Sequence, residues 1–149
     1  MGRARVGRRG RPTTPSLTVD AFFRSGRELL LVRRGHPPFR GRWALPGGFV
    51  ELTESCEHAV LRELREETGL TAKVHRLLGV YSAPGRDPRG PNASAVFEVR
   101  GRRGRPVGGD DAREARWWPV DALPPLAFDH DQIVADALAR AAPRRRTRR

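Results

Sequence analysis

Apolar and polar positions alternate along the chain in a way that predicts several short strands. Residues 17–23 (LTVDAFF) read as a strand with one more apolar side, and residues 28–34 (ELLLVRR) as a second strand buried along its middle. A turn at Ser25-Gly26 separates the two. Further strands are predicted in three segments: residues 74–82, 94–100 and 115–119.

The pattern changes to a helical period over residues 55–68. Thr53 or Ser55 is placed to cap the start of this helix, and Gly69 is placed to end it. Just before the helix, residues 46–48 (PGG) predict a tight turn.

A second helix is predicted near the end of the chain. Asp129 is positioned as its N-cap, with Gln132 placed to complete a capping box. Its predicted inner face consists of Ile133, Val134, Ala137, Leu138 and Ala141. Strands that enclose one helix and precede another predict an α/β fold with a mixed sheet between helices.

The net charge of +12 is concentrated at the two ends of the chain. Five arginines lie in residues 3–11 and five in residues 144–149, which leaves +2 for residues 16–142. Residues 1–15 and 143–149 lack apolar periodicity, so we predict two disordered tails around a single domain. Only one of the 29 basic residues is a lysine. An overall arginine bias therefore explains the tails more simply than nucleic-acid binding, which we do not expect.

Several classes of protein are excluded or disfavoured by composition. Cys56 is the only cysteine, which excludes an intrachain disulfide and a cysteine-cluster metal site. No apolar run approaches the length of a membrane span, and no apolar segment follows the basic start as in a secretory signal. We therefore expect a cytoplasmic protein with no membrane partner.

Three carboxylates share one face of the first predicted helix. At about 100° per residue, Glu66 and Glu67 lie within about 60° of Glu63. The apolar residues of the helix form a separate stripe, so these glutamates face away from the core. A solvated acidic face is one interpretation; the other is a site for a hard divalent cation such as magnesium, which prefers carboxylate oxygens.

The segment around this helix favours the metal site. Residues 48–70 (GFVELTESCEHAVLRELREETGL) fit the pattern G-x5-E-x7-R-E-U-x-E-E-x-G-U at every fixed position, where U is a bulky apolar residue. Nine constrained positions within 23 residues make a chance match improbable. This pattern is the Nudix box, and the chain resembles the Nudix hydrolase family over residues 16–142.

The resemblance implies the Nudix fold, an α/β/α sandwich with a mixed β-sheet, and magnesium-dependent hydrolysis of a nucleoside diphosphate derivative. Manganese is an alternative metal. The implied metal ligands are Glu63, Glu66, Glu67 and the carbonyl of Gly47. Arg62 is implied to orient the glutamates, and Glu54 to support the loop or join the metal shell. A metal-activated water would attack phosphorus, so no side-chain nucleophile is required.

The general base remains open between two positions. In some relatives it is the box glutamate that matches Glu63, and in others it is an acid from a later loop. Residues 101–118 offer Asp110, Asp111 and Glu114, of which Asp111 lies where similar enzymes often place that acid. A solvated turn is the alternative interpretation of this loop.

The stretch YSAPGRDPRG (residues 81–90) resembles the corresponding segment of ADP-ribose pyrophosphatases. Arg86 and Arg89 are candidates to grip phosphate or ribose, and Tyr81 is a candidate to stack on a base. Arg34 is a further substrate-binding candidate, and Trp43 and Phe39 are candidates to line the base pocket. For these arginines a merely solvated loop is the alternative, and for Trp43 a place in the core.

We expect ADP-ribose to be cleaved to AMP and ribose 5-phosphate. The alternatives are another Nudix substrate such as an oxidised nucleoside triphosphate, and a non-enzymatic domain that senses ADP-ribose. An RNA-binding Nudix protein has only the arginine-rich composition in its favour. A homodimer is an expectation from the family alone.

Overall fold

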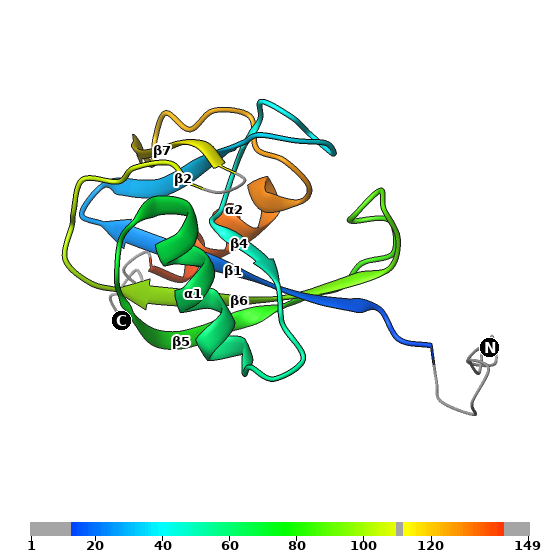
Figure 1. Ribbon diagram of the computed structural model, residues 1–149. Helices are drawn as coiled ribbons and strands as arrows, with labels where there is room; N and C mark the ends of the chain where they lie inside the picture. Colours follow the sequence, from blue (N-terminus) through cyan, green and yellow to red (C-terminus); the bar gives the residue numbers. More distant parts are fainter. Residues whose placement is uncertain (1–12, 110–111, 142–149) are drawn as a thin grey trace, which may run out of the picture.

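The computed structural model describes residues 13–109 and 112–141, whose strands form one sheet (Figure 1). Its elements are β1 (Ser16–Ser25), β2 (Glu28–Arg34), β3 (Trp43–Ala44), β4 (Gly47–Phe49), α1 (Cys56–Thr68), β5 (Lys73–Tyr81), β6 (Asn92–Arg100), β7 (Ala112–Pro119) and α2 (His130–Ala141). The predicted strands and helices are therefore confirmed. The tight turn predicted at residues 46–48 is wrong, because Gly47 and Gly48 belong to β4 and pair with β1.

The sheet is mixed, as predicted. Its strand order is β3-β2-β1-β6-β5, with β4 also paired to β1 and β7 to β2. β1 and β6 are parallel, whereas each of the other paired strands is antiparallel to its neighbour. β1 is therefore the central strand, and it contacts both β4 and β6, which border the site described below.

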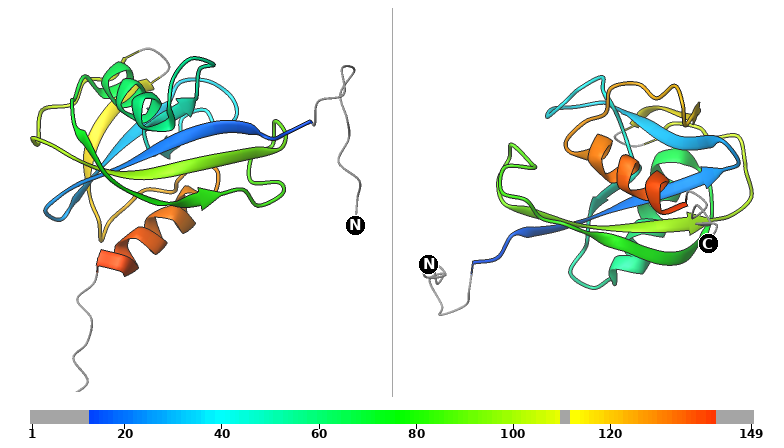
Figure 2. Two further views of the ribbon diagram at one scale, coloured as in Figure 1. Left: turned by 90° about the horizontal axis from the view of Figure 1, so that it is seen from below. Right: turned by 180° about the vertical axis from the view of Figure 1, so that it is seen from behind.

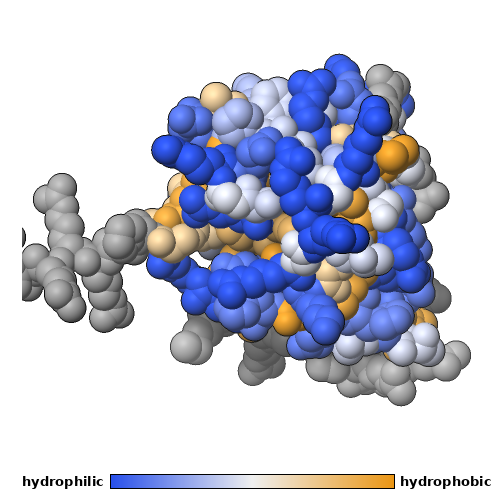
Figure 3. All heavy atoms as spheres, turned by 90° about the vertical axis from the view of Figure 1, so that its left-hand side faces the viewer, coloured by the Kyte–Doolittle hydropathy of each residue, from blue (hydrophilic) through white to orange (hydrophobic). Residues whose placement is uncertain are grey.

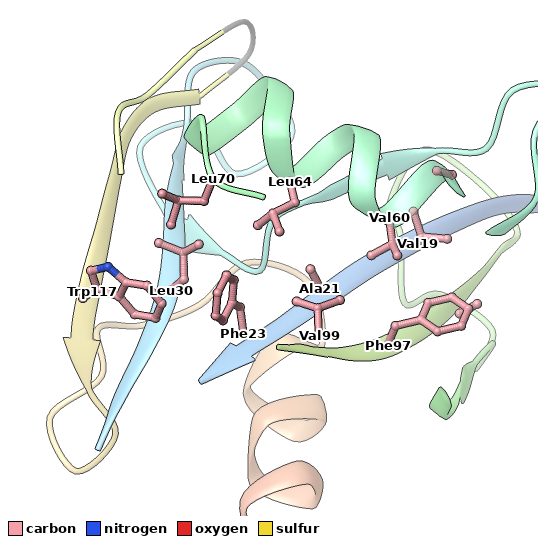
Figure 4. Close-up of a cluster of buried hydrophobic side chains, with 12 residues drawn as sticks. Val19, Ala21, Phe23, Leu30, Val60, Leu64, Leu70, Phe97, Val99 and Trp117 are labelled. Carbon is pink, nitrogen blue, oxygen red and sulfur yellow. The ribbon is translucent and has the colours of Figure 1, made fainter. Parts of the chain in front are cut away.

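Alternate residues of β1 point to opposite faces of the sheet, as the two-residue period of a strand requires. Val19, Ala21 and Phe23 join a buried cluster with Val60 and Leu64 of α1 (Figure 4). A second cluster, which includes Phe22 of β1, packs the other face against α2 and is completed by Ile133, Val134 and Ala137. The helices lie on opposite sides of the sheet (Figure 2), which confirms the α/β/α sandwich.

The ends of α1 are set by local capping. The hydroxyl of Ser55 accepts a hydrogen bond from the backbone of His58 at 3.1 Å, so Ser55 is the N-cap. Gly69 ends the helix in the left-handed conformation (φ 72°), where a side chain would be strained. Val60 and Leu64 are buried in the core, whereas Glu63 and Glu67 lie partly buried at the edge of this buried face and Glu66 is exposed.

The capping box predicted for α2 is not formed. Both carboxylate oxygens of Asp129 accept hydrogen bonds from Arg86, and the side chain of Gln132 donates to Asp136. Ala141, predicted on the inner face, is exposed. Asp129 therefore ties the start of α2 to a distant loop instead of capping the helix with its side chain.

Hydrophilic side chains cover most of the face shown in Figure 3, with smaller apolar areas between them. No helix in residues 13–109 and 112–141 is long and apolar enough to span a membrane.

Candidate active site

A cleft with a volume of about 330 Å³ opens between α1, the central strands and the start of α2. One part of the lining, which we call the box wall, is formed by Gly47, Gly48, Arg62, Glu63 and Glu67, and we include in it Glu54 and Glu66, which bond to Arg62 but do not line the cleft. A second part of the lining, the network wall, is formed by Asp20, Arg86, Asn92 and His130, and Asp129 bonds to Arg86 there.

On the box wall, two glycines let the backbone approach its neighbours closely. A Cβ atom at Gly47 would lie 2.1 Å from the carbonyl oxygen of Val19, which cannot move away because it belongs to the central strand. A Cβ atom at Gly48 would lie 2.5 Å from Oε1 of Glu63. The absence of side chains therefore lets Gly47 lie against β1 and Gly48 against the carboxylate of Glu63.

Arg62 is the centre of the box wall. Its guanidinium donates to Glu54 at 2.5 and 2.9 Å, to Glu63 at 2.9 Å and to Glu66 at 3.1 Å. It also donates to the carbonyl oxygen of Phe49 at 3.2 Å, which joins α1 to the end of β4. One cation therefore holds three carboxylates and the strand that carries the two glycines.

The electrostatics of this group follow from that shared cation. Hydrogen bonds from Arg62 and from the backbone of Glu51 lower the pKa of Glu54 to about 2. The hydrogen bond to Glu54 raises the pKa of Arg62, so the guanidinium remains charged. Burial raises the pKa of Glu63, and the hydrogen bond from Arg62 only partly opposes it. A raised pKa makes the Glu63 carboxylate a stronger proton acceptor.

The donor set of the box wall suits a hard divalent cation, because it combines three α1 carboxylates with the backbone of a glycine. Oε2 of Glu67 accepts from the backbone N–H of Gly47 at 3.1 Å, so the third carboxylate is also directed at β4. In the part of the chain that the structure describes, no three His, Cys, Asp or Glu side chains are yet grouped to hold a metal. Arg62 pairs with both Glu63 and Glu66, at 2.9 and 3.1 Å, and offsets only part of their charge.

On the network wall, the side chain of Arg86 is committed to a buried ion pair. Its guanidinium donates to both oxygens of Asp129, at 2.6 and 2.9 Å, and also to the side-chain oxygen of Asn92. Only 5% of the Arg86 side chain is exposed. The predicted phosphate-gripping arginine therefore holds the loop before β6 to the start of α2.

A second buried contact joins Asp20 of β1 to His130 of α2. Nδ1 of His130 accepts the backbone N–H of Leu45 at 3.0 Å, so the ring proton lies on Nε2, which is 3.5 Å from Asp20. Burial lowers the pKa of His130, and protonation of Nδ1 would break the bond from Leu45. The hydroxyl of Ser94 donates to the same carboxylate. The histidine thus joins β1, the segment before β4 and the start of α2.

The remaining predicted binding residues divide into two groups. Arg89 lines the cleft and is paired with the buried Asp87 at 2.9 Å. Arg34 also lines the cleft, and its Nε donates to the carbonyl oxygen of Pro38 at 2.7 Å. The cleft lining does not include Trp43, which is buried against Trp118 with ring centroids 5.1 Å apart.

Tyr81 is likewise directed away from the cleft. Its hydroxyl donates to Asp136 of α2 at 2.6 Å, and its ring packs on the apolar cluster beneath that helix. Burial and the neighbouring carboxylate raise the pKa of Tyr81 to about 12. The structure therefore brings neither Tyr81 nor Trp43 to the site where we expected a base to bind.

Of the loop acids considered as general base, Asp110 and Asp111 lie outside the described residues. Glu114 is in β7, where it pairs with Arg33 at 3.2 Å. The proposed catalytic role of Asp111 thus stays a prediction.

The sequence does not predict three of the residues that line the cleft. Asp20 is a single acidic residue among the apolar residues of β1, and this is the only feature of the sequence that indicates a role for it in the site. Phe49 follows the two glycines and Phe128 precedes Asp129, and both line the cleft. No local pattern distinguishes these phenylalanines from core residues.

Comparison with known proteins agrees with this geometry. The family model described as NUDIX domain matches residues 14–137. The chain is 50% identical over 122 residues to "ADP-ribose pyrophosphatase" of Methanocaldococcus jannaschii, covering 82% of this chain and 72% of that protein. It is 31% identical to "ADPR responsive transcriptional repressor NtrR" of Acinetobacter baylyi, covering 85% of this chain but only 54% of the repressor.

Among solved structures, the NUDIX domain of Shewanella oneidensis NrtR complexed with ADP ribose superposes with a TM-score of 0.80 at 32% identity. The match covers 87% of this chain and 90% of that domain. The MutT/nudix family protein from Enterococcus faecalis has a TM-score of 0.79 at 33% identity and covers 87% and 62%. The chain belongs to the NUDIX domain family.

Proposed function

We propose that this protein is a Nudix pyrophosphohydrolase that cleaves ADP-ribose to AMP and ribose 5-phosphate with bound magnesium. The observation that carries the proposal is the box wall, where Arg62 gathers three carboxylates opposite the glycine-lined backbone of β4. The 50% identity to an ADP-ribose pyrophosphatase supports the choice of substrate.

Glu63, Glu66, Glu67 and the Gly47 carbonyl would hold the metal, which supplies charge to stabilise the pyrophosphate and to acidify a water molecule. Arg62 holds Glu63 and Glu66 beside the end of β4. Glu63, whose pKa is raised by burial, is placed to accept a proton at its carboxylate. Asp111 remains the alternative proton acceptor. Manganese fits the same oxygen-rich site.

The location and the oligomeric state of the enzyme are part of the same proposal. We expect the enzyme to act on a free nucleotide in the cytoplasm. The family expectation of a homodimer also stays a prediction.

The test is a side-by-side assay of the purified protein with ADP-ribose, ATP and an oxidised guanine nucleoside triphosphate at equal concentration. We expect AMP and ribose 5-phosphate to be released from ADP-ribose faster than either triphosphate is cleaved. Triphosphates that are cleaved tenfold faster would overturn the substrate. Tight binding of ADP-ribose without turnover would instead indicate a sensor, the role named for the NtrR relative.

A further inference from the structure

Three side chains from separate parts of the fold meet at the cleft. Phe49 ends β4, Arg89 lies in the loop before β6, and Phe128 precedes α2, and all three line the cleft. The guanidinium of Arg89 is 5.2 Å from the ring centre of Phe49 and 5.8 Å from that of Phe128. We refer to this group as the aromatic platform.

The platform is partly open to solvent, unlike the apolar core. Phe49 is 49% exposed, and the side chain of Arg89 is 42% exposed. A phenylalanine in this position adds little to folding because half of its surface remains in water. The open surface is therefore available to a ligand in the cleft.

Phe128 is held in place by neighbours at a conformational cost. Its φ is 53°, a left-handed value that non-glycine residues rarely adopt. The ring of Phe39, which also has a positive φ (59°), packs edge-on against it at 4.9 Å, and Arg34 lies 4.9 Å from its centre. Strained residues of this kind are concentrated at functional sites, where the surrounding structure maintains them.

Arg89 is also held in a defined position. Its Nε and Nη2 donate to Asp87 at 3.1 and 2.9 Å, and the side chain of Asp87 is only 5% exposed. The Arg89 charge is therefore already paired, which leaves its flat face as the surface offered beside the two rings. A flat guanidinium next to aromatic rings is suited to stacking on a planar π-system.

We infer that the aromatic platform binds the adenine ring of the nucleotide half of the substrate by stacking. Phe49 directly follows Gly48, which lies against Glu63, so a base on Phe49 is next to a pyrophosphate held at the box wall. Ribose 5-phosphate has no π-face to stack, so of the two halves only the AMP half matches the platform. The inference rests on the proposed function for its choice of ligand. It moves the base site from Trp43 and Tyr81 to the platform.

The experiment measures binding of AMP and of ribose 5-phosphate by calorimetry, in the presence of magnesium, to wild-type protein and three variants. Phe49→Ala removes the ring and leaves the backbone bond to Arg62 available, and Phe49→Tyr keeps the ring. Leu52→Ala is the matched control, because Leu52 is fully exposed in the following loop and does not line the cleft.

We expect Phe49→Ala to weaken AMP binding about tenfold, since stacking of one base on one aromatic side chain has about this effect. Ribose 5-phosphate binding should stay within twofold, and Phe49→Tyr and Leu52→Ala should bind AMP as the wild type does. Unchanged AMP binding by a folded Phe49→Ala, a selective loss of ribose 5-phosphate binding, or no AMP binding by the wild type would overturn the inference. Weakened AMP binding in a protein that does not hydrolyse ADP-ribose would retain the platform and reject the proposed function.

Discussion

Charged side chains line both walls of the cleft, but the balance of charge differs between them. On the box wall, three carboxylates share the single guanidinium of Arg62. On the network wall, Arg86 is paired with one carboxylate, Asp129, and with one neutral amide. The second carboxylate of this wall, Asp20, accepts a hydrogen bond from Ser94, and burial raises its pKa. Several carboxylates around one cation repel each other and are destabilised unless a further cation binds to them. An ion pair of one cation and one carboxylate, such as Arg86 with Asp129, needs no further ion. The box wall is therefore suited to bind, and the network wall to hold the fold together.

The largest effect should come from removing charge on the box wall. We expect Glu66→Gln or Glu67→Gln to lower turnover at least about a hundredfold, or ~2.7 kcal/mol, because no neighbour can replace either carboxylate. The fold should survive, because these side chains lie off the buried face of α1. Steady-state rates at saturating magnesium provide the measurement. Rates within threefold of wild type for both variants would remove the metal assignment.

The opposite result is expected for the network wall. Arg86→Ala leaves Asp129 without its ion-pair partner, so stability should fall by about 2–3 kcal/mol, with a fall in Tm of about 5–10 °C. Arg86→Ala combined with Asp129→Ala should be less destabilising than Arg86→Ala alone, because no unpaired charge remains. Thermal unfolding checks both variants. An Arg86→Ala protein with an unchanged Tm and a raised KM would return this arginine to the substrate site.

The glycines of β4 offer a finer comparison. We expect Gly47→Ala to prevent normal folding, because its Cβ would meet the backbone of β1. Gly48→Ala should fold, because its Cβ meets only the movable end of Glu63, but displacement of that carboxylate should lower turnover about tenfold, or ~1.4 kcal/mol. Circular dichroism and steady-state kinetics together separate the two effects. Full activity in Gly48→Ala would show that the close approach has no catalytic importance.

The smallest effect concerns Tyr81, which the structure places with the supporting elements. Its pKa is raised to about 12, and it is the only tyrosine, so phenolate absorbance reports this residue alone. An ordinary tyrosine is half ionised near pH ~10. Because the folded pKa exceeds the unfolded one, the stabilisation is complete below pH ~10 and is lost as the pH rises through about 12.

Absorbance titration of the folded protein should therefore show a midpoint near 12, and Asp136→Asn should lower it toward the ordinary value. A wild-type midpoint near pH ~10, with folding verified by circular dichroism, would show that the Tyr81 hydroxyl is not bonded to α2.

The sequence was sufficient to predict the elements whose signals are local. The period and caps of α1 located the helix and its three glutamates, and the alternation of β1 predicted its two faces. The Nudix box then identified the family, because its spacing is set by one short segment of chain.

Contacts between distant segments were not predictable in this way. Arg86 and Asp129 are 43 positions apart, and nothing near either residue indicates the other as its partner. Trp43 and Tyr81 were expected at the base site because their rings are suited to stacking. Instead, Trp43 is buried against Trp118, and the partly buried Tyr81 packs beside α2. Phe49, at the end of β4, and Phe128, before α2, meet at the cleft only because the fold brings these distant segments together.

The central claim is that the box wall binds a divalent cation and that the network wall takes no part in binding it. Manganese binding, followed by electron paramagnetic resonance as metal is added to the purified protein, tests this most directly. We expect the wild type and Arg86→Lys to bind manganese alike, and a variant with Glu63, Glu66 and Glu67 all changed to Gln to bind none at the same concentrations. Undiminished manganese binding by the folded triple variant would contradict the account.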